Sequence, residues 1–167
     1  MRAVILISTG AIPTVTQEEP WPYNLPIFRR TFISRSPDEK LEAEIAQAWE
    51  VSMSNPTIGV LKVSDGLVIK DCSPSFIWSN DSRYLAVLHR LLGLFFSVRV
   101  LIVDTRDRAV FASRRIRAWL QPRSFNSGAL VVTASPSQAA REIRWQIPSD
   151  LGSFKRLAYD EIQDQSR

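Results

Sequence analysis

Residues 75–87 read SFIWSNDSRYLAV. The aromatic and aliphatic run 76–78 leads into the polar residues 79–82, and apolar residues resume at Tyr84. Aromatic and β-branched side chains favour an extended, pleated backbone, whereas Asn and Asp tolerate the left-handed angles of tight turns. The stretch therefore predicts a β-hairpin with a four-residue connection, and with it a β-rich fold.

A related segment precedes the hairpin by 43 positions. Residues 36–43, SPDEKLEA, align with residues 79–86, SNDSRYLA, and share the Ser, the Asp and the final Ala, with Lys40 in the place of Arg83. Residues 60–66 correspond in the same way to residues 100–105. A period of about 40–45 residues, made of turn, strand, loop and strand, is typical of a four-stranded propeller blade.

This repeat decides how residues 41–51 are interpreted. Leu41, Ile45, Ala48 and Trp49 have helical spacing, but strict alternation fits equally well. In a strand, this alternation would place the following residues on one face: Leu41, Ala43, Ile45, Gln47, Trp49 and Val51. Because the repeat places a strand after each turn, we predict that residues 41–51 form a strand.

The motifs SPD at 36–38 and WSNDSRYLA at 78–86 resemble the W-S-P-D-G-r-x-L-A pattern of β-propeller blades. Propellers of the WD-repeat and prolyl-oligopeptidase kinds share this pattern, and the likeness covers residues 34–113. Glu39 and Ser82 stand at the glycine position of the pattern, and no Trp-Asp dipeptide closes either unit. A closed propeller needs at least about four blades of roughly 40 residues, more than this chain provides.

We therefore predict an all-β, mainly antiparallel protein. Two blade-like sheets would pack as a sandwich or as an open, propeller-like pair, with a short C-terminal helix. The single domain 1–167 divides into an N-terminal strand with a proline-rich connection (1–33), a first blade-like unit (34–76), a second unit (77–120) and closing strands with the terminal helix (121–167). Ser149 or Asp150 would begin this helix.

Composition limits the class of protein. The chain has 167 residues, 45% of them hydrophobic and 23% charged, as is usual for a soluble globular protein. Its single cysteine, Cys72, excludes an intrachain disulfide, and no apolar run approaches the ~18 residues of a membrane helix. We expect a cytoplasmic protein that does not bind membranes. The net charge of +4 is compatible with an acidic protein or a nucleic acid as partner.

The sequence offers little for catalysis. His89 is the only histidine, which excludes a histidine-rich metal site, and nothing in the sequence places Cys72 or a serine beside it. Glu42, Glu44 and Glu50 alternate along one strand, and Asp104 and Asp107 occupy a turn. Such carboxylates either form a solvated surface or serve a carboxylate-dependent hydrolase. We predict no catalytic residue, no metal site and no cofactor, and keep the hydrolase as an alternative.

Residues 88–96 are unexpectedly apolar for a connection between two strands. They either belong to the core or form a binding surface, together with the corresponding connection of the first unit. These residues are the candidate partner-binding set: Met53, Asn55, Leu91, Leu92, Leu94, Phe95 and Phe96.

Arginines gather between positions 106 and 123, with aromatic residues between them. Arginine pairs with phosphates, and aromatic rings stack on bases, so this segment makes a nucleic-acid-binding module the second hypothesis. The alternative is a solvated sheet face whose arginine stems cover apolar surface. The candidate contacts to an anionic partner are Arg106, Arg108, Arg115, Arg117 and Arg123.

In its general look, a short β protein without a catalytic signature, the chain is similar to small bacterial proteins found beside secreted polymorphic toxins. That similarity implies an immunity protein, which plugs the active site of its cognate toxin. Our first prediction is therefore a non-enzymatic protein-binding domain that blocks a toxin. A pair of half-propellers would also permit a homodimer.

Overall fold

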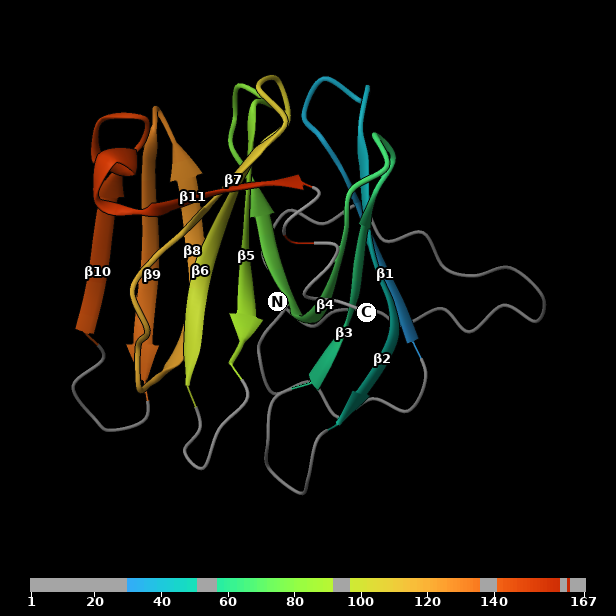
Figure 1. Cartoon of the computed structure of the whole chain (residues 1–167), viewed down its shortest axis with the longest axis horizontal. Helices are drawn as coiled ribbons and strands as arrows, with labels where there is room; N and C mark the ends of the chain where they lie inside the picture. The colour runs from blue at the N-terminus through green and yellow to red at the C-terminus, as the bar shows by residue number, and fades with distance from the viewer. Residues whose placement is uncertain (1–29, 51–56, 92–96, 136–140, 160–161, 163–167) are drawn as a thin grey trace, which may run out of the picture.

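The computed structural model describes residues 30–50, 57–91, 97–135, 141–159 and 162. These residues form two open antiparallel sheets, which confirms the predicted all-β class. The larger sheet has the order β1-β2-β3-β4-β5-β6-β7-β11, and the smaller has the order β10-β9-β8 (Figure 1). The strands are β1 (Arg30–Arg35), β2 (Glu42–Glu50), β3 (Thr57–Val63), β4 (Val68–Trp78), β5 (Tyr84–Arg90), β6 (Val98–Asp104), β7 (Ala109–Ala112), β8 (Trp119–Asn126), β9 (Ala129–Ser135), β10 (Arg141–Gln146) and β11 (Lys155–Ala158).

Strand β4 folds the larger sheet back on itself. Cys72 pairs with Gly59 of β3 and with His89 of β5, and the regular β4–β5 register resumes only at Phe76. The interruption contains Pro74, which has no amide hydrogen to donate, and follows Asp71, whose φ of 55° is left-handed. Figure 1 shows β4 running alongside β3, turning back and continuing toward β5. The bend divides the sheet into a first half (β1–β3 with the start of β4) and a second half (the end of β4 with β5, β6, β7 and β11).

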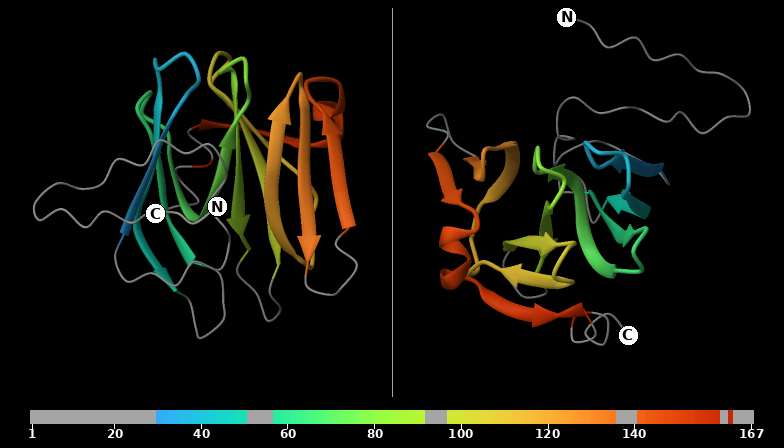
Figure 2. Two further views of the ribbon diagram at one scale, coloured as in Figure 1. Left: turned by 180° about the vertical axis from the view of Figure 1, so that it is seen from behind. Right: turned by 90° about the horizontal axis from the view of Figure 1, so that it is seen from above.

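The two halves and the three-stranded sheet make three layers, as the right-hand view of Figure 2 shows. A first core lies between the two halves and includes Ile45, Leu61, Ile69, Val87, Leu101 and Val110. A second core lies between the second half and the three-stranded sheet and includes Ala86, Leu88, Ile102, Phe125, Leu130 and Val132. Because side chains alternate across a strand, β5 and β6 contribute to both cores.

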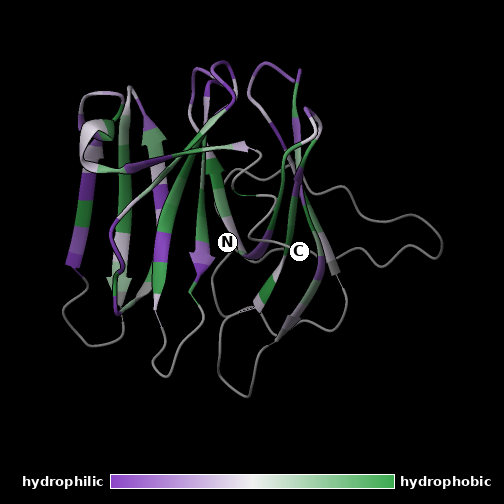
Figure 3. Cartoon of the chain, in the orientation of Figure 1, coloured by the Kyte–Doolittle hydropathy of each residue, from purple (hydrophilic) through white to green (hydrophobic). Residues whose placement is uncertain are grey.

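The sequence repeat corresponds to a structural repeat in the turns. Ser36 Oγ bonds Asp38 and accepts the Leu41 amide, and Ser79 Oγ bonds Asp81 and accepts the Tyr84 amide. The residue at the glycine position is left-handed in both copies, with φ of 60° at Glu39 and 63° at Ser82. The turns also touch, since the Asp38 amide donates to Ser82 Oγ at 2.9 Å. They lie at the upper end of the molecule, where Figure 3 shows hydrophilic colouring.

Strand β2 confirms the strand predicted over residues 41–51, but not the predicted faces. Gln47 has a φ of 53°, and the register with β3 shifts between Ala46 and Trp49. This bulge adds one residue to the strand, so Ala48 is buried in the first core and Trp49 is 47% exposed. The single-face alternation that placed Trp49 beside Ile45 is therefore wrong.

The predicted short C-terminal helix corresponds to a 3-10 turn. A 3-10 turn covers Ser149–Ser153, with Pro148 at its N-cap and no side-chain cap, and β11 follows immediately. Leu157 pairs with Val110 of β7 and is buried in the first core. The ladder with β7 and this burial outweigh local helix propensity. Residues 116–120 form a single bridge from Ile116 to Val98, followed by the start of β8.

No helix within the described residues is long and apolar enough to cross a membrane.

Candidate partner-binding end of the sheet sandwich

Both predicted binding connections, one from each blade-like unit, start from the same end of the molecule. Strands β2 and β5 both run toward the end opposite the tight turns, and β3 and β6 start there (Figure 1). Of the predicted binding residues only Leu91 is described; it is partly buried, and its amide donates to the Ser97 carbonyl at 2.9 Å. These residues lie outside the described part of the chain: Met53, Asn55, Leu92, Leu94, Phe95 and Phe96. We use the name open end only for this position opposite the tight turns, where β2 and β5 end and β3 and β6 begin.

A polar row crosses the second half at the open end. Cys72, His89 and Arg99 are register partners on β4, β5 and β6. Register partners in an antiparallel sheet share a face, and Cys72 belongs to the first core, so all three lie on the first-core side. Arg99 Nε donates to His89 Nδ1 at 3.3 Å. Nothing in the sequence places Cys72 beside His89; the β4–β5 register does so.

The electrostatics of this row do not favour nucleophilic catalysis. Burial, and then the positive charge of Arg99, lower the pKa of His89 to about 4. Burial, and then the charge of Asp71, raise the pKa of the Cys72 thiol far above its usual range. A reactive cysteine needs a lowered pKa, because the thiolate is the nucleophile. Neutral His89 and protonated Cys72 therefore do not form an activated pair.

Arg99 has no carboxylate partner among the described residues. The one side-chain hydrogen bond that it makes there goes to the neutral imidazole of His89, and burial lowers the pKa of Arg99. Two positions earlier, Ser97 is fully buried and its hydroxyl has no partner within the described residues. The open end thus presents a guanidinium without a counter-charge from the described part of the chain.

Trp49 lies one residue before the end of β2, at the same end of the molecule. It is the one large hydrophobic side chain that is exposed among the residues that the structure describes. Its register partner is Ile58 of β3, which lies on the face opposite the first core and is itself buried. The open end is therefore flanked by an exposed indole outside and by Arg99 inside.

The five predicted anion-binding arginines occupy three separate places. Arg106 and Arg108 lie in the β6–β7 turn, where Arg108 donates to the Asp65 carbonyl at 3.1 Å and stacks on Tyr159. Arg115 and Arg117 flank Ile116, which pairs with Val98 at the opposite end of β6. Arg123 lies on β8 and donates to Thr133 Oγ1 at 3.2 Å. The structure thus divides this set between the two ends of β6 and a different sheet.

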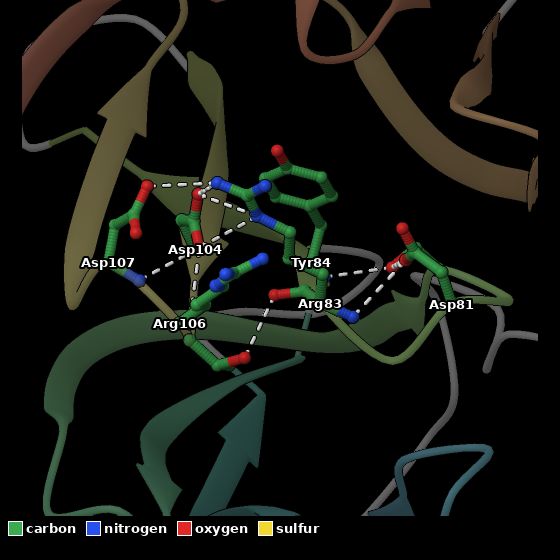
Figure 4. A network of polar contacts seen from close by, with 8 residues as sticks. Asp81, Arg83, Tyr84, Asp104, Arg106 and Asp107 are labelled. Atoms are coloured by element: carbon green, nitrogen blue, oxygen red, sulfur yellow. Dashed lines mark hydrogen bonds and ion pairs between the residues drawn. The ribbon is translucent and has the colours of Figure 1, made fainter.

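The predicted acidic residues hold turns together. Asp104 is buried and accepts a bidentate pair from Arg83, with Nη2–Oδ2 at 2.7 Å, while Asp107 binds the same guanidinium at 2.9 Å (Figure 4). Asp104 Oδ1 also accepts the backbone amides of Arg106 and Asp107. Glu42 pairs with Arg35 at 3.3 Å. Among the described residues no group of three or more His, Cys, Asp or Glu side chains is arranged to hold a metal ion.

No protein-family model, no curated protein and no solved structure matches the chain.

Proposed function

We propose that this protein is a non-enzymatic binding domain that docks a protein partner at the open end. The observation that carries this proposal is the exposure of Trp49, 47% of which is accessible. Tryptophan is enriched among the few residues that dominate the energy of protein interfaces. An acidic protein suits the net charge of +4.

The bulge in β2 supports this role for Trp49. Without the extra residue at Gln47, alternation would turn Trp49 toward the first core, where Ile45 and Ala48 lie. β-Bulges commonly re-aim a side chain next to a functional site. The bulged backbone thus directs the indole outward; its exposure is not the result of a lack of space in the core.

The narrower form of the proposal is an immunity protein that blocks a bacterial toxin. Such an inhibitor needs a preformed rigid surface and no catalytic group of its own. The layered sheets provide the rigid support, and the open end provides an apolar anchor and a positive charge.

The test compares affinity purification from native lysate with the wild-type chain and with Trp49→Ala. Because the indole is exposed, the variant should keep its circular dichroism spectrum and melting temperature while partner recovery falls at least about tenfold. Lys40→Ala is the matched control, since its exposed side chain lies at the opposite end. Nuclease treatment should leave the capture unchanged.

Two results contradict the proposal. Equal capture by Trp49→Ala and wild type removes Trp49 from the interface. If nuclease treatment removes every captured protein, the capture depends on nucleic acid, and the second hypothesis, nucleic-acid binding by the arginines between positions 106 and 123, is favoured. For the narrower form, expressing the captured partner alone should arrest a host, and co-expressing the wild-type chain, but not Trp49→Ala, should restore growth.

A further inference from the structure

We propose that Arg99, positioned by His89, receives an acidic side chain of the protein partner at the open end. This inference rests on the proposed function and adds the chemistry of the partner: a carboxylate that inserts beside the rim of the first core.

The contrast with Arg83 is the first argument. Arg83, at the end of the tight turns, is two-thirds buried and binds the carboxylates of Asp104 and Asp107 at 2.7 and 2.9 Å. Arg99 is also partly buried, but its described partner is the uncharged ring of His89. A partly desolvated guanidinium is costly without a counter-charge. Within the described residues, Arg83 receives this charge from two carboxylates and Arg99 receives it from none.

The fixed orientation of Arg99 is the second argument. The bond from Nε to His89 Nδ1 uses one of the five donors of the guanidinium and fixes its plane against β5. The two terminal nitrogens have no described partner. Those nitrogens match a carboxylate, which guanidinium groups bind with two parallel hydrogen bonds.

Ser97 is an independent observation at the same place. The Leu91 amide continues the β5–β6 ladder to Ser97, which therefore lies on the Arg99 side of the strand pair. Its hydroxyl is fully buried and has no described partner, although buried hydroxyls are normally hydrogen-bonded. The Ser97 hydroxyl is therefore a second polar group on this side of the strand pair that has no described partner.

The position of the site favours a protein over a free ion. His89 and Arg99 lie near the ends of β5 and β6 that face the open end, and Trp49 lies near the matching end of β2. One partner that covers this end can contact the indole outside the first half and the guanidinium inside the second. A free anion would use Arg99 alone.

The experiment measures the affinity of the captured partner for four full-length chains: wild type, Arg99→Met, Arg106→Met and Trp49→Ala. Arg106→Met removes the same charge from an exposed side chain at the opposite end. Arg99→Met should weaken binding at least about tenfold, because a desolvated carboxylate on the partner loses its counter-charge, whereas Arg106→Met should bind like wild type. If both variants lose the same affinity, the loss comes from the lower net charge of the chain and not from the Arg99 site, and the inference is overturned.

The two proposals fail separately. If Trp49→Ala loses the partner but Arg99→Met retains it, the binding domain stands and the Arg99 inference is wrong. If both variants retain the partner, both proposals are wrong.

A second measurement covers the case in which Arg99→Met does not fold. Titration of the isolated wild-type chain with acetate, followed by NMR, should shift the Arg99 Nε–H resonance, and Arg99→Lys identifies that resonance by its loss. Because a free anion uses Arg99 alone, acetate should bind weakly and shift this resonance only at high concentration; no shift at any concentration overturns the inference. The same titration is made with inorganic phosphate. If phosphate saturates the shift at a lower concentration than acetate does, the ligand of Arg99 is a phosphate and not a carboxylate, which also overturns the inference.

Discussion

At the scale of single residues, the ionisable groups of this protein differ by whether a partner lies within the chain. Arg83 and Asp104 compensate each other in the turns, and Asp104 also fixes two backbone amides (Figure 4). His89 and Arg99 instead meet as a neutral base and a cation. The identities of all four residues are plain in the sequence, but their partners depend on strand register.

The first prediction concerns Asp104 and Asp107, which share Arg83. Asp104→Asn should lower the free energy of unfolding by about 2 kcal/mol, because the Arg83 guanidinium loses the negative charge of a buried carboxylate. Asp107→Asn should cost about 0.5 kcal/mol or less, because Asp107 is 57% exposed. Urea denaturation of both variants at neutral pH measures the difference. Equal losses would show that burial of Asp104 does not matter.

The second prediction concerns pH. The pKa of His89 is lowered to about 4 in the folded chain, below the usual value of 6.5, so the unfolded chain binds the proton more tightly. The contribution of neutral His89 is therefore complete above about pH 6.5 and is lost as the pH falls toward 4. Over this window the free energy of unfolding should fall by about 2 kcal/mol more in wild type than in His89→Gln.

Carboxylates also titrate between pH 6.5 and 4, but they are common to wild type and His89→Gln. The difference between the two pH profiles, measured by urea denaturation, therefore isolates the imidazole. Parallel profiles would mean that His89 is solvated and accessible to protons in the folded state.

At the scale of elements, strand β2 shows what alternation in the sequence predicts and what it misses. The repeat correctly favoured a strand over a helix, because the turn at residues 36–41 matches the turn at residues 79–84. The sequence of β2 does not predict the bulge, since its left-handed residue is Gln47 and not the Gly or Asn that usually adopts this conformation. Gly59, opposite the bulge on β3, is the signal that sequence reasoning passed over, because a glycine within a strand often marks a close backbone approach.

The third prediction tests that close approach. A Cβ built at Gly59 would lie 2.6 Å from the Ala46 carbonyl oxygen and 3.1 Å from Ala48 Cα. These are backbone atoms of the bulged strand, so Gly59→Ala should destabilise the protein by roughly 2 kcal/mol. Gly152→Ala is the control, because nothing lies within 4 Å of its added Cβ. A melting temperature of Gly59→Ala equal to that of Gly152→Ala would contradict the bulged geometry.

At the scale of the whole molecule, the second half of the large sheet is the middle layer of three. Its strands β5 and β6 are buried on both faces, which explains their nearly unbroken apolar sequences. The sequence predicted two blade-like sheets that pack together, and the bend in β4 makes this packing possible within one hydrogen-bonded sheet. The third layer, β8–β10, comes from the residues that the sequence analysis described as closing strands.

The fourth prediction follows from the middle layer. Leu101 and Ile102 are adjacent on β6 and fully buried in different cores. Leu101→Ala and Ile102→Ala should each cost about 2–5 kcal/mol in the free energy of unfolding, since each leaves a cavity in a packed core. In a sheet with one solvated face, only one of the two would do so. Guanidinium denaturation decides, and a cost below about 1 kcal/mol for either contradicts the three layers.

The class of fold and the repeated turns can be predicted from the amino-acid sequence. These features are local: turn chemistry depends on Ser, Asn and Asp within a few positions, and strand formation depends on β-branched and aromatic runs. Three features depend on how the strands pair. Trp49 is exposed, residues 155–158 pair with β7, and one row contains Cys72, His89 and Arg99. Each of these depends on the register between paired strands, which the residues of one strand alone do not specify. A shift of one residue in register reverses the face of every side chain that follows.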